Sequence, residues 1–124
     1  MAIRKIITEP NKILRQKSLR VESVDKDIQK LMDDLLETMY ATPGIGLAAI
    51  QIGVAKRVIV MDISKGEEPK KPMYFVNPEI VWKSEEQFTY EEGCLSLPNQ
   101  FAEVDRPKQC HVHYLDYNGN EQVL

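Results

Sequence analysis

Cysteines and long apolar runs are scarce in this sequence. Its 124 residues contain only two cysteines, Cys94 and Cys110, which are too few for the disulfide framework of a small secreted domain. No apolar run approaches the ~20 residues that a membrane-spanning helix needs. The first 16 residues mix charged and apolar side chains, so they lack the apolar stretch of a signal peptide. These features favour a reducing compartment, and we expect the cytoplasm.

An excess of positive charge is also missing. The sequence has 16 Lys and Arg against 19 Asp and Glu, a net charge of −3. This balance gives no electrostatic reason to expect a nucleic acid or an anionic membrane as a partner. Hydrophobic residues make up 43% of the chain, which is typical of a globular protein. We therefore predict one domain over residues 1–124.

One segment has clear helical periodicity. Its apolar side chains recur at steps of three and one, which predicts an amphipathic helix with a single buried stripe. The stripe consists of Ile28, Leu31, Met32, Leu35, Leu36, Met39 and Tyr40. Asp25 can cap the start of this helix, and Pro43 with Gly44 should end it.

The rest of the chain is predicted to be extended. Residues 57–63 are typical of a strand buried on both faces. Residues 73–82 form a second strand, in which Asn77-Pro78 indicates an edge or a bulge. Residues 86–97 and 100–104 are extended around Pro98. Residues 110–117 and 120–124 flank Asn118-Gly119, a strong hairpin signal. Because the returning strand is short, we expect that the sequence is truncated at its C-terminal end.

Two segments are candidates for chemistry. The first is Gly44-Ile-Gly-Leu-Ala-Ala-Ile-Gln51, where Gln51 stands among apolar neighbours and needs partners for its amide. It is either a simple turn with Gln51 bonded to the backbone or a functional loop. The second is Glu92-Gly-Cys-Leu-Ser-Leu-Pro98, whose Cys94 is either a buried small hydrophobe or a metal ligand or nucleophile.

The two histidines form a third candidate. His111 and His113 share one face of a predicted strand, because side chains alternate along a strand. They are either surface residues or a metal-binding pair that Cys94 completes. Substitution of both histidines by alanine separates these two interpretations.

The two motifs together resemble those of the peptide deformylase family, and the resemblance covers the chain from about Ile6 onward. It implies an α+β fold with antiparallel sheets around a central helix. It also implies a metallohydrolase that removes the formyl group from formyl-methionyl nascent chains near the ribosome, in the cytoplasm of bacteria or in organelles. The implied cofactor is a divalent metal, Fe²⁺ in the cell, with Zn²⁺, Ni²⁺ or Co²⁺ as substitutes.

The resemblance assigns roles to individual residues. Cys94 matches the metal-binding cysteine. Gln51 and the backbone N–H of Leu95 match the donors to the formyl oxygen. The substrate-binding positions implied in the same way are Ile45, Gly46, Glu92 and Gly93. Glu92 and Arg106 are candidates for a supporting ion pair, and Phe101 stands where relatives often have a basic residue.

The family's third motif, a helical His-Glu-x-x-His that supplies two metal ligands and a general base, does not occur in these residues. We therefore expect this chain alone to be inactive, with metal absent or weakly bound. We also expect it to self-associate through apolar surface left uncovered. The alternative function is a non-catalytic, truncated deformylase-like module that binds peptides.

Overall fold

The structure is a computed structural model that describes residues 2–124, and its one long helix, α1, spans Lys26–Ala41. The Asp25 carboxylate caps the helix by accepting a hydrogen bond from the N–H of Ile28 at 3.0 Å. The predicted stripe is buried except for Tyr40, which is half-buried. Met39 is fully buried. The periodicity therefore predicted the helix and its buried face correctly. No helix in residues 2–124 has the length and apolar character needed to cross a bilayer.

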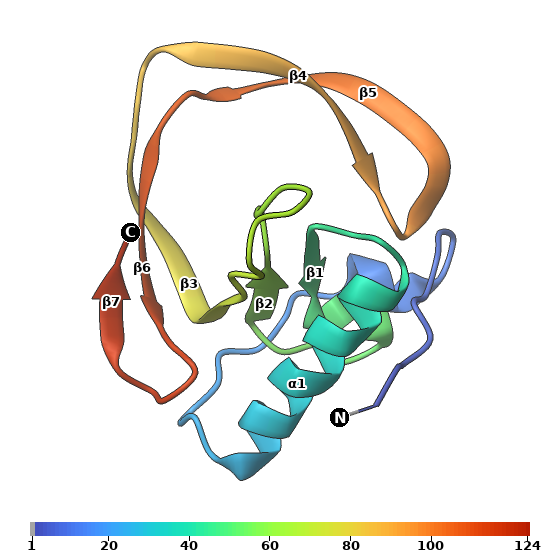
Figure 1. The fold of residues 1–124 in the computed structure, drawn as a ribbon, viewed down its shortest axis with the longest axis vertical. Helices are drawn as coiled ribbons and strands as arrows, with labels where there is room; N and C mark the ends of the chain where they lie inside the picture. The colour runs from blue at the N-terminus through green and yellow to red at the C-terminus, as the bar shows by residue number, and fades with distance from the viewer. Residues whose placement is uncertain (1) are drawn as a thin grey trace.

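The main sheet has five strands in the order β1-β2-β3-β6-β7, and every neighbouring pair is antiparallel. The strands are β1 (Gly46–Ala48), β2 (Val58–Met61), β3 (Met73–Lys83), β6 (Cys110–Leu115) and β7 (Glu121–Val123). Helix α1 lies against the β1 and β2 end of the sheet, as Figure 1 shows. The core consists of Val21, Ile28, Leu31, Met32, Leu35, Leu36, Met39, Leu47, Ala49, Ile52, Val58, Val60 and Val76.

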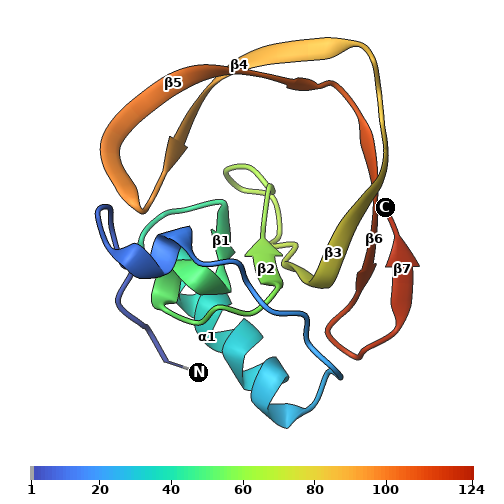
Figure 2. The same cartoon turned by 180° about the vertical axis from the view of Figure 1, so that it is seen from behind.

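A separate two-stranded ribbon joins β4 (Gln87–Cys94) to β5 (Leu97–Pro107). It continues outward from β3 and β6, and both views show it arching over to the other end of the molecule (Figures 1 and 2). Its tip returns to the N-terminal segment and to two short 3₁₀ helices, η1 (Lys12–Arg15) and η2 (Ala49–Ile52). The ribbon thereby brings Cys94 back to the part of the fold that carries Gln51.

The observed strand β2 differs in two respects from the strand predicted for residues 57–63. It is shorter, spanning Val58–Met61, and it is not buried on both faces. Val58 and Val60 are buried, whereas Ile59 and Met61 are half-buried. One face of β2 packs in the core with α1, and an antiparallel strand covered on one side alternates in this way.

Asn77-Pro78 lies at a bulge, one of the two predicted possibilities. The β3–β6 register shifts between Val76 and Glu79, while β3 itself is an inner strand. Asn77 has a φ of 51°, and its buried side chain bonds both the N–H and the carbonyl of Val21 at 2.7 Å. The bulge therefore fastens the N-terminal segment to the sheet.

Two other predicted boundaries were wrong. The segment predicted for residues 86–97 ends at Cys94, and β5 begins at Leu97 and runs through Pro98. Proline is tolerated there because β5 is an outer strand of the ribbon. The C-terminal hairpin is confirmed, but its loop spans residues 116–120. The Asp116 carboxylate widens this loop by accepting from the N–H groups of Asn118 and Asn120.

Candidate active site

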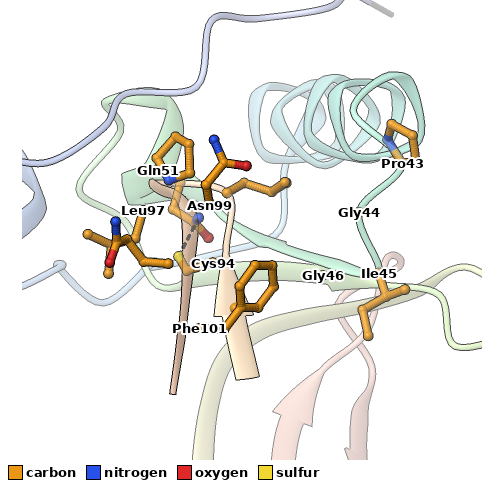
Figure 3. Close-up of a pocket in the computed structure, with 13 residues that line it drawn as sticks. Pro43, Gly44, Ile45, Gly46, Gln51, Cys94, Leu97, Asn99 and Phe101 are labelled. Atoms are coloured by element: carbon orange, nitrogen blue, oxygen red, sulfur yellow. Dashed lines mark hydrogen bonds between the residues drawn. The ribbon is translucent and has the colours of Figure 1, made fainter. Parts of the chain in front are cut away.

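A cavity of about 630 Å³ lies where the ribbon tip meets the end of α1 and the η2 helix (Figure 3). One wall comes from the loop after α1 and the start of β1. The opposite wall comes from the ends of β4 and β5, and Gln51 of η2 joins the two. The lining residues are Pro43, Gly44, Ile45, Gly46, Gln51, Gly93, Cys94, Leu95, Leu97, Pro98, Asn99, Gln100 and Phe101.

Gln51 is held at both ends of its amide. Its Oε1 accepts a hydrogen bond from the Ala48 N–H at 3.0 Å. Its Nε2 lies 3.2 Å from Ser96 Oγ and 3.5 Å from Cys94 Sγ, as a donor to both. The carbonyl half of the amide is thus bonded to the backbone, as the simple turn interpretation expects. The nitrogen half instead points directly at the cysteine beside it (Figure 3).

Cys94 and Leu95 occupy the tip of the ribbon. Cys94 is an exposed free thiol. The Leu95 side chain packs against the core, which holds its backbone beside the cavity. A Cβ at Gly44 would come within 2.8 Å of Leu95 Cδ1, so the glycine provides space for this side chain. The two motifs are therefore in direct contact, although residues 52–91 separate them in the sequence.

Three large apolar side chains stand exposed around the cavity, namely Ile45, Leu97 and Phe101. The Phe101 ring lies over Gly93, where a Cβ would be only 2.9 Å from its Cε1. Of the predicted substrate-binding positions, Ile45, Gly46 and Gly93 line the cavity. Glu92 lines a smaller adjoining hollow of about 300 Å³ that shares Gly93, Cys94 and Phe101.

The predicted ion pair between Glu92 and Arg106 is present. The Arg106 guanidinium donates two hydrogen bonds to the Glu92 carboxylate, at 2.5 and 2.6 Å. These bonds hold the pKa of the Glu92 carboxyl below its usual value. The pair lies on the ribbon beside the cavity and keeps Glu92 ionised there.

The comparisons with known proteins agree with this geometry. The family model described as "Polypeptide deformylase" matches residues 3–124. This chain belongs to the peptide deformylase family.

A peptide deformylase of Pelagibacter ubique is 62% identical over 124 residues, covering 100% of this chain and 72% of the relative. The structure of a peptide deformylase from Ehrlichia chaffeensis has a TM-score of 0.94 at 43% identity, covering 99% of this chain and 74% of that one. The structure of the Ehrlichia enzyme in complex with actinonin has a TM-score of 0.92 at 46% identity, covering 100% of this chain and 74% of that one. These likenesses confirm the predicted α+β deformylase fold.

Peptide deformylases are metal-dependent hydrolases, so a metal centre in this chain would need several donor side chains close together. Residues 2–124 contain no group of three His, Cys, Asp or Glu side chains able to hold an ion. A catalytic metal commonly takes three protein ligands, and Cys94 is the one candidate here. The described residues alone therefore do not fit a deformylase metal centre. The expected Fe²⁺ stays a prediction.

The alternative metal site built from Cys94, His111 and His113 was wrong. His111 pairs with Trp82 and His113 with Glu79 on the neighbouring strand β3. The His111 ring packs 4.8 Å from the Trp82 ring. The ribbon carries Cys94 away from β6, so these three side chains do not converge.

Sequence reasoning missed Ser96. Its side chain is buried, and its Oγ accepts from the Gln51 amide. A small polar residue between Leu95 and Leu97 was an available signal, because a buried hydroxyl needs a hydrogen-bond partner. Its partner, however, could be known only from the fold.

Proposed function

We propose that this cavity binds the formyl-methionyl end of a polypeptide, and that the deformylase to which these residues correspond removes its formyl group. The observation that carries this proposal is the 3.5 Å approach of the Gln51 amide nitrogen to the Cys94 sulfur. The approach places a hydrogen-bond donor beside the predicted metal-binding thiol, within a cavity that has apolar walls. Membership in the deformylase family supports the same reaction.

Two donors are proposed to bind the formyl oxygen. Gln51 Nε2 is already fixed by the Ala48 N–H on its carbonyl side, so little reorganisation is needed on binding. The Leu95 N–H follows Cys94 directly, on a backbone held by the half-buried Leu95 side chain, which packs against the core. Donors placed in advance stabilise the oxyanion of a tetrahedral intermediate, and loss of one typically lowers the rate about 10²–10³-fold.

The peptide is proposed to lie along β1. This strand is at one end of the main sheet, so one of its edges is open to an added strand. Gly46 begins β1 without a side chain to obstruct such a strand. The exposed side chains of Ile45, Leu97 and Phe101 offer apolar contacts for methionine.

For a polypeptide consisting of these 124 residues we propose binding without hydrolysis. Among residues 2–124 Cys94 is the one candidate ligand for a metal, and a lone thiolate holds a catalytic ion poorly. The described residues alone therefore supply no metal-dependent hydrolytic step in this proposal. This corresponds to the alternative function, a deformylase-like module that binds peptides.

Self-association is proposed as a second property of the same polypeptide. Large apolar side chains on β3 and β4 are exposed, namely Ile80, Trp82, Phe88 and Tyr90. Apolar surface of this kind favours association with a second copy of the chain. Sedimentation velocity over a hundredfold concentration range should show a rising average mass, and a constant monomer mass would contradict the proposal.

Peptide titration tests the proposed function. The ¹⁵N-labelled chain is titrated with formyl-Met-Ala-Ser and separately with Met-Ala-Ser. The formylated peptide should bind more tightly and should shift the Leu95 amide signal. Gln51→Leu should weaken its binding about tenfold, since one hydrogen bond to the ligand is lost. Gln29→Leu is the matched control, because Gln29 Nε2 donates to the Tyr117 carbonyl outside the cavity.

Equal binding of the two peptides, or no effect of Gln51→Leu, would contradict the proposed site. Formate release is followed in the same samples with one equivalent of Fe²⁺ or Zn²⁺. Sustained turnover would overturn the proposal that these 124 residues bind without hydrolysis.

A further inference from the structure

Three hydrogen bonds form a closed ring that links the N-terminal segment, Gln51 and Ser96 beside the candidate site. The Ile7 N–H donates to the Gln51 carbonyl at 2.8 Å, and the Glu9 N–H donates to the Ser96 carbonyl at 3.0 Å. The Gln51 side chain then closes the ring by donating to Ser96 Oγ at 3.2 Å. Three segments that are distant in the sequence are joined in this way.

Ser96 is the residue where these bonds meet. It lies two positions after Cys94, in the turn between β4 and β5, and it is only 4% exposed. Its hydroxyl accepts from Gln51, while its carbonyl accepts from Glu9. A shift of this turn would therefore change the direction of the Gln51 amide and the position of the cysteine together.

The ribbon needs such an anchor. It leaves the main sheet through β3 and β6, and its tip lies at the opposite end of β4 and β5 (Figures 1 and 2). A two-stranded ribbon is only marginally stable without further packing. Small movements at its base would accumulate along its length, so contacts at the tip must fix the distance between Gln51 and Cys94.

We propose that Ser96 is a positioning residue for the Gln51 amide, and that residues 7–9 form a tie that holds the ribbon tip to η2. This inference rests on the proposed function only in the role it gives to Gln51. The tie explains why an irregular N-terminal segment belongs to the site. The tie acts through the backbone N–H groups of Ile7 and Glu9. Within residues 2–124, the N–H of the intervening Thr8 bonds neither to η2 nor to the ribbon tip.

NMR relaxation of the Gln51 side-chain amide tests the role of Ser96. The signals are assigned by their loss in Gln51→Leu. In the unmodified chain the order parameter of Gln51 Nε2 should be near the rigid value of about 0.85, and in Ser96→Ala it should fall below about 0.6. Ser96→Thr, which keeps the hydroxyl, should restore it. Ser84→Ala is the control, because Ser84 Oγ accepts from the Gln109 N–H at the base of the ribbon.

A purely structural role for Ser96 would lower the unfolding midpoint without changing the Gln51 order parameter. That result would overturn the proposal. If the formylated peptide fails to bind the unmodified chain, the proposed function fails, while these relaxation data still decide the role of Ser96.

Proline substitution tests the tie. Ile7→Pro removes the N–H that bonds to Gln51, so the order parameters of the Cys94 and Leu95 amides should fall. Thr8→Pro is the matched control and should leave both amides rigid. Hydrogen exchange in the unmodified chain provides a measurement that needs no variant. The Ile7 and Glu9 amides should exchange at least tenfold more slowly than the Thr8 amide, and equal rates would overturn the tie.

Discussion

The Arg106 guanidinium binds the Glu92 carboxylate across the two strands of the ribbon. Residues 92 and 102 are register partners, as are 88 and 106, so both charged side chains share one face with Phe88 and Tyr90. The opposite face carries Thr89, whose partner in the register is Asp105. One face of the ribbon therefore carries two aromatic rings and an ion pair, whereas the other is polar apart from Phe101 near the tip.

Removal of the arginine should change the titration of its partner. In the unmodified chain the Arg106 guanidinium lowers the pKa of the Glu92 carboxyl. In Arg106→Ala this pKa should therefore rise toward its usual value. The folded-state pKa is depressed, so the pair stabilises the fold above the usual glutamate pKa and loses this effect as the pH falls through the lower value. Carboxyl ¹³C NMR measures the shift.

The control for this measurement is Lys108→Ala. Lys108 Nζ lies 3.5 Å from the Glu86 carboxylate at the base of the ribbon, so its removal leaves Glu92 and its partner in place. An unchanged Glu92 titration in Arg106→Ala would mean that the ion pair does not form in solution.

A second carboxylate, Asp62, anchors the loop that follows β2. It accepts from the Ser64 hydroxyl and N–H, from the Tyr40 hydroxyl and from the Lys71 N–H. These bonds, above all the one from the Ser64 hydroxyl, lower the pKa of Asp62 to about 2. Burial, together with this carboxylate, raises the pKa of Tyr40 to about 12.

Removal of the tyrosine hydroxyl should therefore raise the pKa of Asp62. The folded-state value is depressed, so the stabilisation is complete above the usual aspartate pKa and is lost as the pH falls toward 2. Tyr40→Phe should lower the free energy of unfolding at pH 7, and the further loss between pH 7 and pH 3 should be smaller than in the unmodified chain, because the pKa of Asp62 is less depressed. Urea unfolding at the two pH values measures both effects. Tyr117→Phe is the matched control, because the Tyr117 hydroxyl donates to Asp33. Equal acid sensitivity in the two variants would argue against the bond to Asp62.

The predictable parts of this fold depend on local signals. The stripe of α1 and its Asp25 cap depend on residues three or four positions apart, so periodicity was sufficient. Asn77-Pro78 indicated an edge or a bulge through the missing proline N–H, and the structure has the bulge, with Asn77 at a positive φ that asparagine tolerates. The prediction that β2 is buried on both faces was wrong, because burial depends on what covers each face of the sheet.

The site could be predicted only in part, because it is built from distant segments. The resemblance of two motifs to those of the deformylase family identified Gln51 and Cys94, but no local pattern shows that the ribbon returns its tip to η2. Ser96 and residues 7–9 were missed for a related reason. Two of the bonds in their ring are between backbone groups, which any sequence possesses, so no side-chain pattern indicates them.

Burial of the helix stripe is expected to dominate stability. Leu35 is fully buried in the core, so Leu35→Ala should lower the free energy of unfolding by about 2–5 kcal/mol. Leu19 is 71% exposed, and Leu19→Ala keeps the backbone bonds that Leu19 makes to Ala55 and Arg57. This control should cost much less. Urea unfolding compares the two variants, and equal losses would show that Leu35 does not pack as described.

The contact between the two motifs gives the last prediction. In Gly44→Ala the new Cβ would lie 2.8 Å from Leu95 Cδ1, so the Leu95 side chain must move. Because this side chain holds the backbone beside Cys94, the Leu95 amide signal should shift, and formyl-Met-Ala-Ser should bind about tenfold more weakly. In Gly46→Ala the nearest atom is the Val60 carbonyl oxygen at 3.8 Å, an ordinary contact, so the Leu95 signal of the free protein should stay in place. A Leu95 signal that is unchanged in Gly44→Ala would show that the glycine is not required to join the two motifs.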